Sequence, residues 1–407
     1  MRVSSNTIYD SNVAALGQQQ TNLLKTQQQV ATGRKIQTAS DDPVAAARAI
    51  SVNQADAMNT QYAANRTSVR HTLSLAESNL QSVTALIQDV QTAAVSAGNG
   101  SLSAIDRRTI ATELSGRLQE LVGLANSTDG AGNYLFAGFQ SKTIPFADVA
   151  GAGITYNGDD GQRLAQANAS RQIAASDSGA DIFMRVKNGN GTFITQATAG
   201  NTGTGIISPG SITDPAALVA GNSYTISFSI AAGVTSYTVT GAPTALAPAM
   251  AGVAYVSGQA ISFGGMQLDI QGAPANGDTF TVVPSTNESI FKTISDLITA
   301  LNATVPTAAN GGTTGLTNSL NRGLNNLDNA LNNVLSIRSS LGLRLQEVDA
   351  LQTAGDDLSL QFKQTLSQLQ DVDYNKAISD LSQQQMSLQA AQKSLATVSN
   401  LSLFNYI

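Results

Sequence analysis

Hydrophobic residues in the first third of the chain recur at alternating intervals of four and three positions. The longest unbroken run comprises Val69, Leu73, Ala76, Leu80, Val83, Ile87, Val90 and Ala94. A second run comprises Ile110, Leu114, Leu118, Leu121 and Ala125. Ser103 and Asp106 stand before it at the spacing of a capping box. This spacing predicts helices that carry a narrow apolar stripe and pack against other helices.

The same spacing returns near the end of the chain. The positions are Leu320, Leu324, Leu327, Leu331 and Val334, then Leu341, Leu345 and Val348, and finally Leu381, Leu388, Leu395 and Val398. Ser285 and Glu288 stand before Ile290 at the spacing of a second capping box. We therefore expect helix to resume after residue 288 and to continue through most of the C-terminal flank.

The first helix differs because its stripe contains amides. Its positions are Tyr9, Val13, Leu16, Gln20, Leu23, Gln27 and Val30. Amides in a helix seam lower stability and can fix register. An isolated helix with so thin a stripe is marginal in water. We therefore expect residues 1–32 and 374–407 to find their helix partners in an assembly, whereas residues 44–130 and 320–371 form an intramolecular bundle.

The middle of the chain has a different pattern. Residues 224–230, 235–240 and 279–283 alternate or are rich in β-branched side chains, which is typical of strands. Residues 141–284 hold 20 of the 35 glycines and 7 of the 9 prolines, and these residues end strands and helices. The sequence thus predicts an α+β fold. The two flanks form a long antiparallel helical bundle or coiled-coil rod, and a β-rich domain is inserted between them.

Composition removes several kinds of chemistry. The chain has no cysteine and one histidine, which argues against disulfides, thiolate metal sites and paired-histidine metal sites. A net charge of −6 argues against nucleic-acid binding, which needs a basic face. No apolar run is long enough to span a membrane, and the first residues lack the apolar core of a secretory signal peptide. The composition thus leaves no metal site built from thiolates or paired histidines.

Three local motifs have simple structural interpretations. Asp42 before Pro43 is typical of a helix start, with Asp42 as the N-cap and Pro43 in the first turn. Residues 157–161 resemble part of a calcium loop, but they lack the regular ligand spacing and the terminal glutamate, so a turn is expected. His71 lies off the apolar stripe and is expected to be a partly exposed helix residue.

Several motifs at both ends, in the same order, resemble one known family. The N-terminal motifs are MRVSS at 1–5, QVATGR at 29–34, SDDP at 40–43, GNYLFAG at 132–138 and PF at 145–146. The C-terminal motifs are LSQLQDVDY at 366–374, QQQMSLQAA at 383–391 and LSLFNYI at 401–407. They resemble those of the hook–filament junction proteins of the bacterial flagellum, which are hook-associated proteins of type 3 and relatives of flagellin. The resemblance covers roughly the first 145 and last 120 residues.

The resemblance implies a structural subunit that joins hook to filament, and we expect no catalytic residue, cofactor or metal. It implies an inner coiled-coil region of residues 1–32 and 372–407, a helical rod of residues 33–140 and 285–371, and an outer β-rich domain of residues 141–284. It implies export through the flagellar type III channel to the extracellular hook–filament junction. The implied partners are further copies in an axial ring, the preceding hook-associated protein, flagellin and an export chaperone, without nucleic acid or membrane insertion.

The predicted subunit interface lies on the terminal helices. Its residues are Val13, Leu16, Leu23, Val30, Leu381, Leu388, Leu395, Val398 and Phe404. The alternative nearest to this function is flagellin, the filament subunit, although its usual termini differ from those of this chain. A carbohydrate-binding β domain on a helical stalk ranks low, because tryptophan is absent and other aromatic residues are sparse in the insert.

Overall fold

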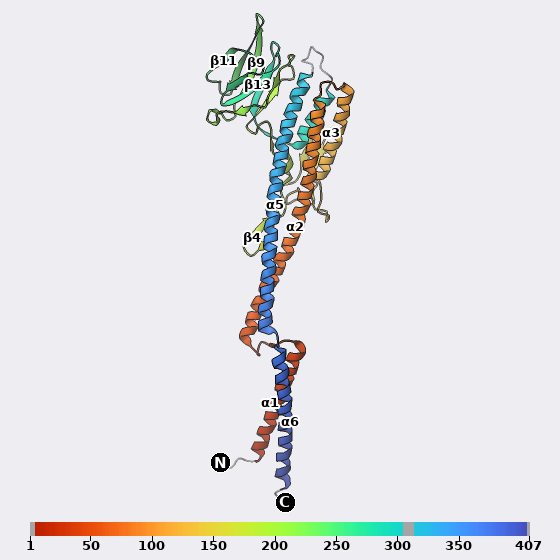
Figure 1. Cartoon of the computed structure of the whole chain (residues 1–407), viewed down its shortest axis with the longest axis vertical. Helices are drawn as coiled ribbons and strands as arrows, with labels where there is room; N and C mark the ends of the chain where they lie inside the picture. The colour runs from red at the N-terminus through yellow and green to blue at the C-terminus, as the bar shows by residue number, and fades with distance from the viewer. Residues whose placement is uncertain (1–4, 304–312, 405–407) are drawn as a thin grey trace. The chain divides into compact units, whose positions relative to one another are not determined.

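The chain consists of two compact units, each built from segments of both flanks. The computed structural model describes residues 5–303 and 313–404, with all side chains except those of residues 5, 6, 8, 9 and 398–404. One unit contains Met1–Asn65 and Ala350–Ile407, and the other contains Arg66–Asp349. Figure 1 shows that the strands lie in the part of the chain between the helical flanks. The expected α+β fold with an inserted β-rich region is confirmed.

The helices of the described residues fall in the expected flanks. They are α1 (Ser5–Thr32), α2 (Pro43–Ala97), α3 (Ala104–Ala125), α4 (Ile290–Asn302), α5 (Thr314–Gln370) and α6 (Tyr374–Phe404). Within the second unit, α2 and α5 run antiparallel. Arg70 pairs with Asp349, Glu77 with Arg338, and Gln91 with Asp328.

The apolar stripe of α2 is the core of this helical part. Every residue of the run from Val69 to Ala94 is buried, and Leu73, Leu80 and Ile87 have no exposed surface. On α5, Leu320, Leu327, Val334, Leu341 and Val348 are buried. The positions between them, such as Leu324 and Leu345, are half-buried. The predicted intramolecular packing of these stripes is therefore confirmed.

The two predicted capping boxes had different outcomes. Ser103 and Asp106 form the predicted box at the start of α3, each side chain bonding to the other's backbone N–H. The box predicted at Ser285 and Glu288 is wrong. The N-cap of α4 is Ser289, whose hydroxyl accepts from the backbone N–H of Lys292. Glu288 lies in a short strand instead, and its carboxylate accepts from Thr293 and Asn326.

The insert contains short hairpins and a two-sheet sandwich. The short strands are β1 (Phe146–Val149), β2 (Gly153–Tyr156), β3 (Leu164–Asn168), β4 (Arg171–Ala174), β5 (Val186–Lys187) and β15 (Asn287–Glu288), with a π-helical turn at Ala180–Met184. They pair as β1 with β2, β3 with β4, and β5 with β15. The predicted strands near 224–230, 235–240 and 279–283 are all present, within the sandwich.

One sheet of the sandwich has the strand order β11-β10-β9-β14-β6, and the other has the order β12-β13-β7, with β8 also pairing with β13. The strands are β6 (Phe193–Ala197), β7 (Ile206–Ile207), β8 (Ser211–Ile212), β9 (Ser223–Ala231), β10 (Val234–Ala242), β11 (Met250–Ala254), β12 (Ala260–Phe263), β13 (Met266–Gln271) and β14 (Thr279–Pro284), with a 3₁₀ turn at Pro215–Ala217. Alternate residues of β9 and β13 point into one shared core, as the period of two in a strand requires.

An aromatic cluster connects the insert to the helices. The ring of Phe146 lies 5.3 Å from that of Phe183 and 5.2 Å from that of Phe291 on α4. Phe136 meets Phe183 edge to face at 5.7 Å. Residues just before the insert and in its first third therefore share one core with the helix that follows the insert.

The motifs without expected chemistry are structural. The Asp42 carboxylate accepts from the N–H of Ala45, and α2 begins at Pro43, as predicted. His71 is exposed. Asp159, within residues 157–161, accepts from the backbone N–H groups of Phe139 and Gly161. Within residues 5–303 and 313–404, no group of three histidine or acidic side chains lies close enough to hold a metal ion. None of the helices in these ranges has the length and hydropathy of a membrane span.

Candidate assembly interface

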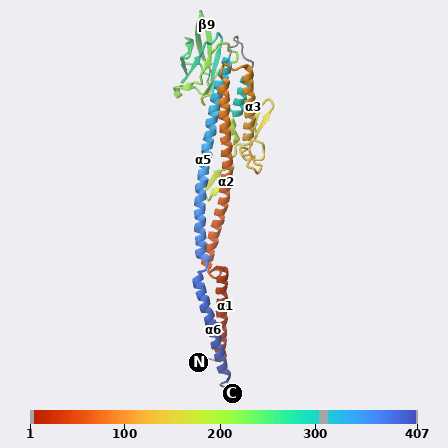
Figure 2. The same cartoon turned by 45° about the vertical axis from the view of Figure 1, so that its right-hand side comes forward.

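The terminal helices α1 and α6 form an antiparallel pair in the first unit. They contact each other along their length and lie side by side in both views (Figures 1 and 2). The end of α1 and the start of α6 meet where Arg34 and Asp371 form an antiparallel backbone bridge and the N–H of Val372 donates to the Gly33 carbonyl. The pair is the candidate interface because several of its large apolar side chains are exposed, whereas those of a hydrophobic core are buried.

The seam of α1 contains apolar and polar residues in alternation. Its least exposed positions include Asn12, Leu16, Gln19, Leu23, Thr26 and Val30, again at intervals of four and three. Leu16, Leu23 and Val30 belong to the predicted stripe. At the alternate stripe positions, which were predicted to be Val13, Gln20 and Gln27, the observed seam lies one residue earlier. Asn12, Gln19 and Thr26 line the seam, whereas Val13, Gln20 and Gln27 are exposed.

The seam of α6 matches the predicted stripe more closely. Its least exposed positions include Ala377, Leu381, Gln384, Leu388, Ala391 and Leu395. Only Ala377 is fully buried, and the three leucines are half-buried. The side chains of the two remaining predicted positions, Val398 and Phe404, lie outside the described residues.

A polar hollow interrupts the seam at its middle. It has a volume of about 320 Å³ and is lined by Gln19 and Asn22 of α1 and by Asp380, Gln383, Gln384 and Ser387 of α6. The Oε1 atoms of Gln19 and Gln384 are buried there, with no hydrogen-bond partner among the described residues. A buried acceptor without a donor is costly, so this layer weakens the pair.

Large apolar side chains lie on the outside of the pair. Val13 is 45% exposed, Leu24 58%, Ile378 54% and Met386 62%. Val13 and Leu24 share one face of α1, which also carries Gln20 and Gln27. These side chains could be covered only by a molecule that packs against the outside of the pair.

The loop between α1 and α2 is held by one ion pair. Lys25 Nζ lies 2.6 Å from Asp41 Oδ1, and the other oxygen of Asp41 accepts from the backbone N–H groups of Gln37 and Thr38. The Lys25 ammonium, followed by these N–H groups, holds the pKa of Asp41 well below its ordinary value. Gly33 begins this loop with φ +70°, a conformation that favours glycine.

Both flanks and the whole chain match flagellar proteins. Residues 3–141 match the bacterial flagellin N-terminal helical region, and residues 324–407 match the bacterial flagellin C-terminal helical region. The flagellar hook-associated protein 3 of Escherichia coli is 30% identical over 404 residues, which is 99% of this chain and 99% of that protein. The chain belongs to the flagellar hook-associated protein 3 family.

Other members of the family agree. The flagellar hook-associated protein 3 of Salmonella typhimurium is 29% identical over 404 residues, which is 99% of both proteins. The crystal structure of flagellar hook-associated protein 3 from Legionella pneumophila has a TM-score of 0.74 and 32% identity, covering 78% of this chain and 98% of that one. The chain is therefore a structural component of the bacterial flagellum, with partners among other flagellar components.

The predicted interface residues thus fall into three groups. Leu16, Leu23, Val30, Leu381, Leu388 and Leu395 are half-buried between α1 and α6, Val13 is exposed, and Val398 and Phe404 are outside the described side chains. Their contact with other subunits stays a prediction. The sequence reasoning missed the exposed Leu24, Ile378 and Met386. Leu24 and Ile378 each follow a seam position by one residue, so a stripe displaced by one residue could have found them, whereas Met386 lies on neither stripe.

Proposed function

We propose that this chain is a non-catalytic subunit that joins the hook of the bacterial flagellum to its filament. The observation that carries the proposal is the similarity over 99% of the chain to two proteins named flagellar hook-associated protein 3. A neighbouring solved structure, at 33% identity, is described as the flagellar junction protein FlgL from Legionella pneumophila. The similarity includes the insert as well as the flanks, which supports a junction protein over flagellin.

We further propose that the chain acts in three regions. Residues 1–32 and 372–407 form the inner coiled coil, residues 33–140 and 285–371 form the helical rod, and residues 141–284 form the outer domain. In this proposal the chain is exported and assembles outside the cell as a ring of identical subunits. It contacts the preceding hook-associated protein on one side and flagellin on the other, after release from an export chaperone.

The proposed assembly step is the covering of the terminal helices by neighbouring subunits. Val13, Leu24, Ile378 and Met386 are about half exposed or more in the single chain, although apolar surface favours burial. The half-buried Leu16, Leu23, Leu381 and Leu388 would lose their remaining exposure in the same step. A pair that is weak alone and strong in a ring suits a subunit that is exported before it assembles.

Removal of the terminal helices tests this step. Deleting residues 1–30 or 375–407 should leave the helical part of the second unit and the β-rich insert folded and should abolish assembly. Circular dichroism and sedimentation would measure the two properties. Loss of the whole fold on either deletion would refute the proposal that the terminal helices serve assembly and are not needed for folding of the rest of the chain.

A sharper test changes single exposed residues. Leu24→Asp and Met386→Asp place a charge on the outside of the pair and should block ring formation without unfolding the monomer. Gln18→Asp is the matched control, since Gln18 is also exposed on α1 but lies six positions before Leu24, on another face of the helix. Equal assembly by Leu24→Asp and the control would show that this face is not an interface.

Flagellin is the second candidate, because the matched terminal regions are those of flagellin. Electron microscopy of a deletion strain separates the two functions. Loss of a junction protein leaves hooks without filaments and flagellin in the medium. Loss of the only flagellin leaves hooks that still carry their junction proteins.

A further inference from the structure

One face of α5 carries polar residues that bind the main chain of the insert. Asn318, Asn326, Asn329, Asn333 and Arg344 lie on this face, at intervals of 8, 3, 4 and 11 residues that return to the same side of a helix. We call these five residues the α5 stripe. All five form hydrogen bonds with residues 174–207, which lead from the short hairpins into the β sandwich.

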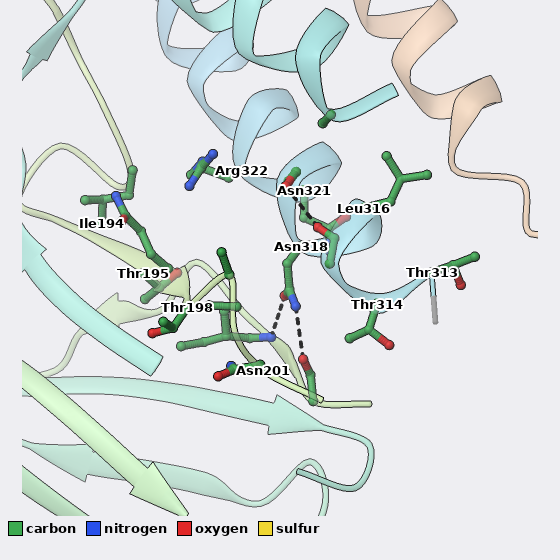
Figure 3. Close-up of a pocket in the computed structure, with 18 of the residues that line it drawn as sticks. Ile194, Thr195, Thr198, Asn201, Thr313, Thr314, Leu316, Asn318, Asn321 and Arg322 are labelled. Atoms are coloured by element: carbon green, nitrogen blue, oxygen red, sulfur yellow. Dashed lines mark hydrogen bonds between the residues drawn. The ribbon is translucent and has the colours of Figure 1, made fainter. Parts of the chain in front are cut away.

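The first contact of the α5 stripe is made by Asn318. Its Oδ1 accepts from the N–H of Ile207 at 3.1 Å, and its Nδ2 donates to the carbonyl of Gly205 at 3.0 Å. Figure 3 shows both bonds, formed by one side chain that points from the helix toward the insert. Asn318 therefore binds the main chain in the same two-pronged way as a neighbouring strand would.

Two further asparagines bind Gly189 from both sides. The N–H of Gly189 donates to Asn326 Oδ1 at 3.0 Å, and its carbonyl accepts from Asn329 Nδ2. Asn326 is only 4% exposed, and its Nδ2 donates to Glu288. Gly189 has φ +60°, and an added Cβ would lie 2.2 Å from the Phe193 carbonyl oxygen. The close approach of Gly189 to the backbone of Phe193 and Ile194 therefore requires glycine at this position.

The remaining contacts continue in order along the helix. Asn333 Nδ2 donates to the carbonyls of Asp181 and Ile182, at 2.9 and 3.0 Å. Arg344 donates to the carbonyl of Ala174 and to the carboxylate of Asp177. From Asn318 to Arg344 the bound residues fall from 207 to 174, so the segment runs antiparallel to α5. The 26 helical residues between these two ends correspond to about 39 Å.

Near Asn318, close packing does not account for the attachment of the insert to α5. Between Asn318 and Asn326 the two parts line an open pocket of about 780 Å³, with residues such as Arg322 on one side and Ile194 and Thr195 on the other (Figure 3). No dispersion contact is made across a pocket of this size. The side-chain hydrogen bonds of Asn318 and Asn326, on either side of the pocket, therefore connect the two parts there.

We propose that the α5 stripe is a main-chain clamp that positions the β sandwich on the helical part of the second unit. Its asparagines bind N–H and C=O groups, which every residue except proline supplies. The clamp therefore tolerates changes of side chain in the bound segment, apart from Gly189. The proposal concerns the chain alone and stands whether or not the chain has its proposed place in the flagellum.

The triple variant Asn318→Ala, Asn329→Ala, Asn333→Ala tests the clamp in the full chain and spares the buried Asn326. Because the chain has no cysteine, spin labels can be placed through Ser339→Cys on α5 and Ser262→Cys on β12, both exposed. Electron resonance should give one narrow distance distribution in the parent and a broader one in the triple variant. Asn332→Ala is the matched control, since Asn332 is exposed on α5 outside the stripe.

Hydrogen exchange of single amides distinguishes the loss of one clamp bond from a general destabilisation of the β sandwich. In Asn318→Ala the N–H of Ile207 loses its acceptor and should exchange about tenfold faster, the factor that corresponds to one lost hydrogen bond. Amides within β9 and β10 should keep their rates, because the sandwich itself stays folded. An unchanged distance distribution in the triple variant, or an unchanged Ile207 rate in Asn318→Ala, would overturn the clamp. If the triple variant does not fold, Asn333→Ala alone is measured in the same way.

Discussion

The two units use the same heptad spacing and bury it to very different depths. In the second unit Leu73, Leu80 and Ile87 of α2 have no exposed surface, whereas Leu16 and Leu23 of α1 in the first unit are only half-buried. The two regions also differ in their second heptad position. It is apolar along α2, with Val69, Ala76, Val83 and Val90, and polar along α1, with Asn12, Gln19 and Thr26.

This difference shows what the spacing does and does not predict. Intervals of four and three place side chains on one side of a helix and so predict that a partner helix exists. They do not state how many partners surround the stripe. In the second unit, α3, α4 and α5 all supply buried residues to the helical core, whereas α1 and α6 have mainly each other. A stripe that needs more partners than its own chain offers indicates assembly.

The largest effect is expected from removing a leucine in the buried stripe. Leu80→Ala leaves a cavity in a packed core and should lower the free energy of unfolding by about 2–5 kcal/mol. The matched change Leu23→Ala removes a half-exposed side chain and should cost the monomer about 1 kcal/mol or less. Hydrogen exchange of amides in each unit measures the two losses separately. Equal losses would mean that the two stripes are buried alike, contrary to the comparison.

A smaller effect, of opposite sign, is expected from making the weak seam apolar. The double variant Gln19→Leu, Gln384→Leu removes two buried oxygens that lack donors, and should stabilise the α1–α6 pair by about 1–2 kcal/mol. Slower hydrogen exchange in both helices would measure the gain. The control Gln20→Leu, Gln385→Leu changes exposed residues on the same helices and should leave the exchange unchanged. A destabilised double variant would show that the polar layer contributes stability.

Much of the fold could be predicted because its signals are local. The stripe of α2, the capping box at Ser103 and the alternating strands are each set by neighbours along the chain. The wrong box at Ser285 shows the limit of such signals. The spacing was suitable, but Glu288 pairs in a strand and accepts from Asn326, which lies 38 residues away in sequence. Contacts of that kind have no local signature.

The candidate site was predictable in part for the same reason. Leu16, Leu23, Leu381 and Leu388 follow from periodicity alone. The displacement by one residue on the other side of α1 does not, because Val13 and Asn12 can each continue the same spacing, and only the position of α6 selects Asn12. The asparagines of the α5 stripe were visible as composition, yet their role depends on a segment more than 100 residues earlier in the chain.

The smallest effect on stability is expected at low pH, in the loop between α1 and α2 of the first unit. Because the pKa of Asp41 is lowered by Lys25 and by two backbone N–H groups, the folded carboxylate stays charged below the ordinary value of about 3.9. The stability from this ion pair is therefore fully present above that value and is lost as the pH falls through the lower, folded pKa. The amide signals of Gln37 and Thr38, which donate to Asp41, should report this titration by NMR. Lys25→Met should move its midpoint upward, toward the ordinary value, whereas Lys35→Met removes a charge from the same loop and should move it less. Equal midpoints in Lys25→Met and the parent would show that Lys25 does not hold the loop, and that α1 contributes to this unit only through its seam.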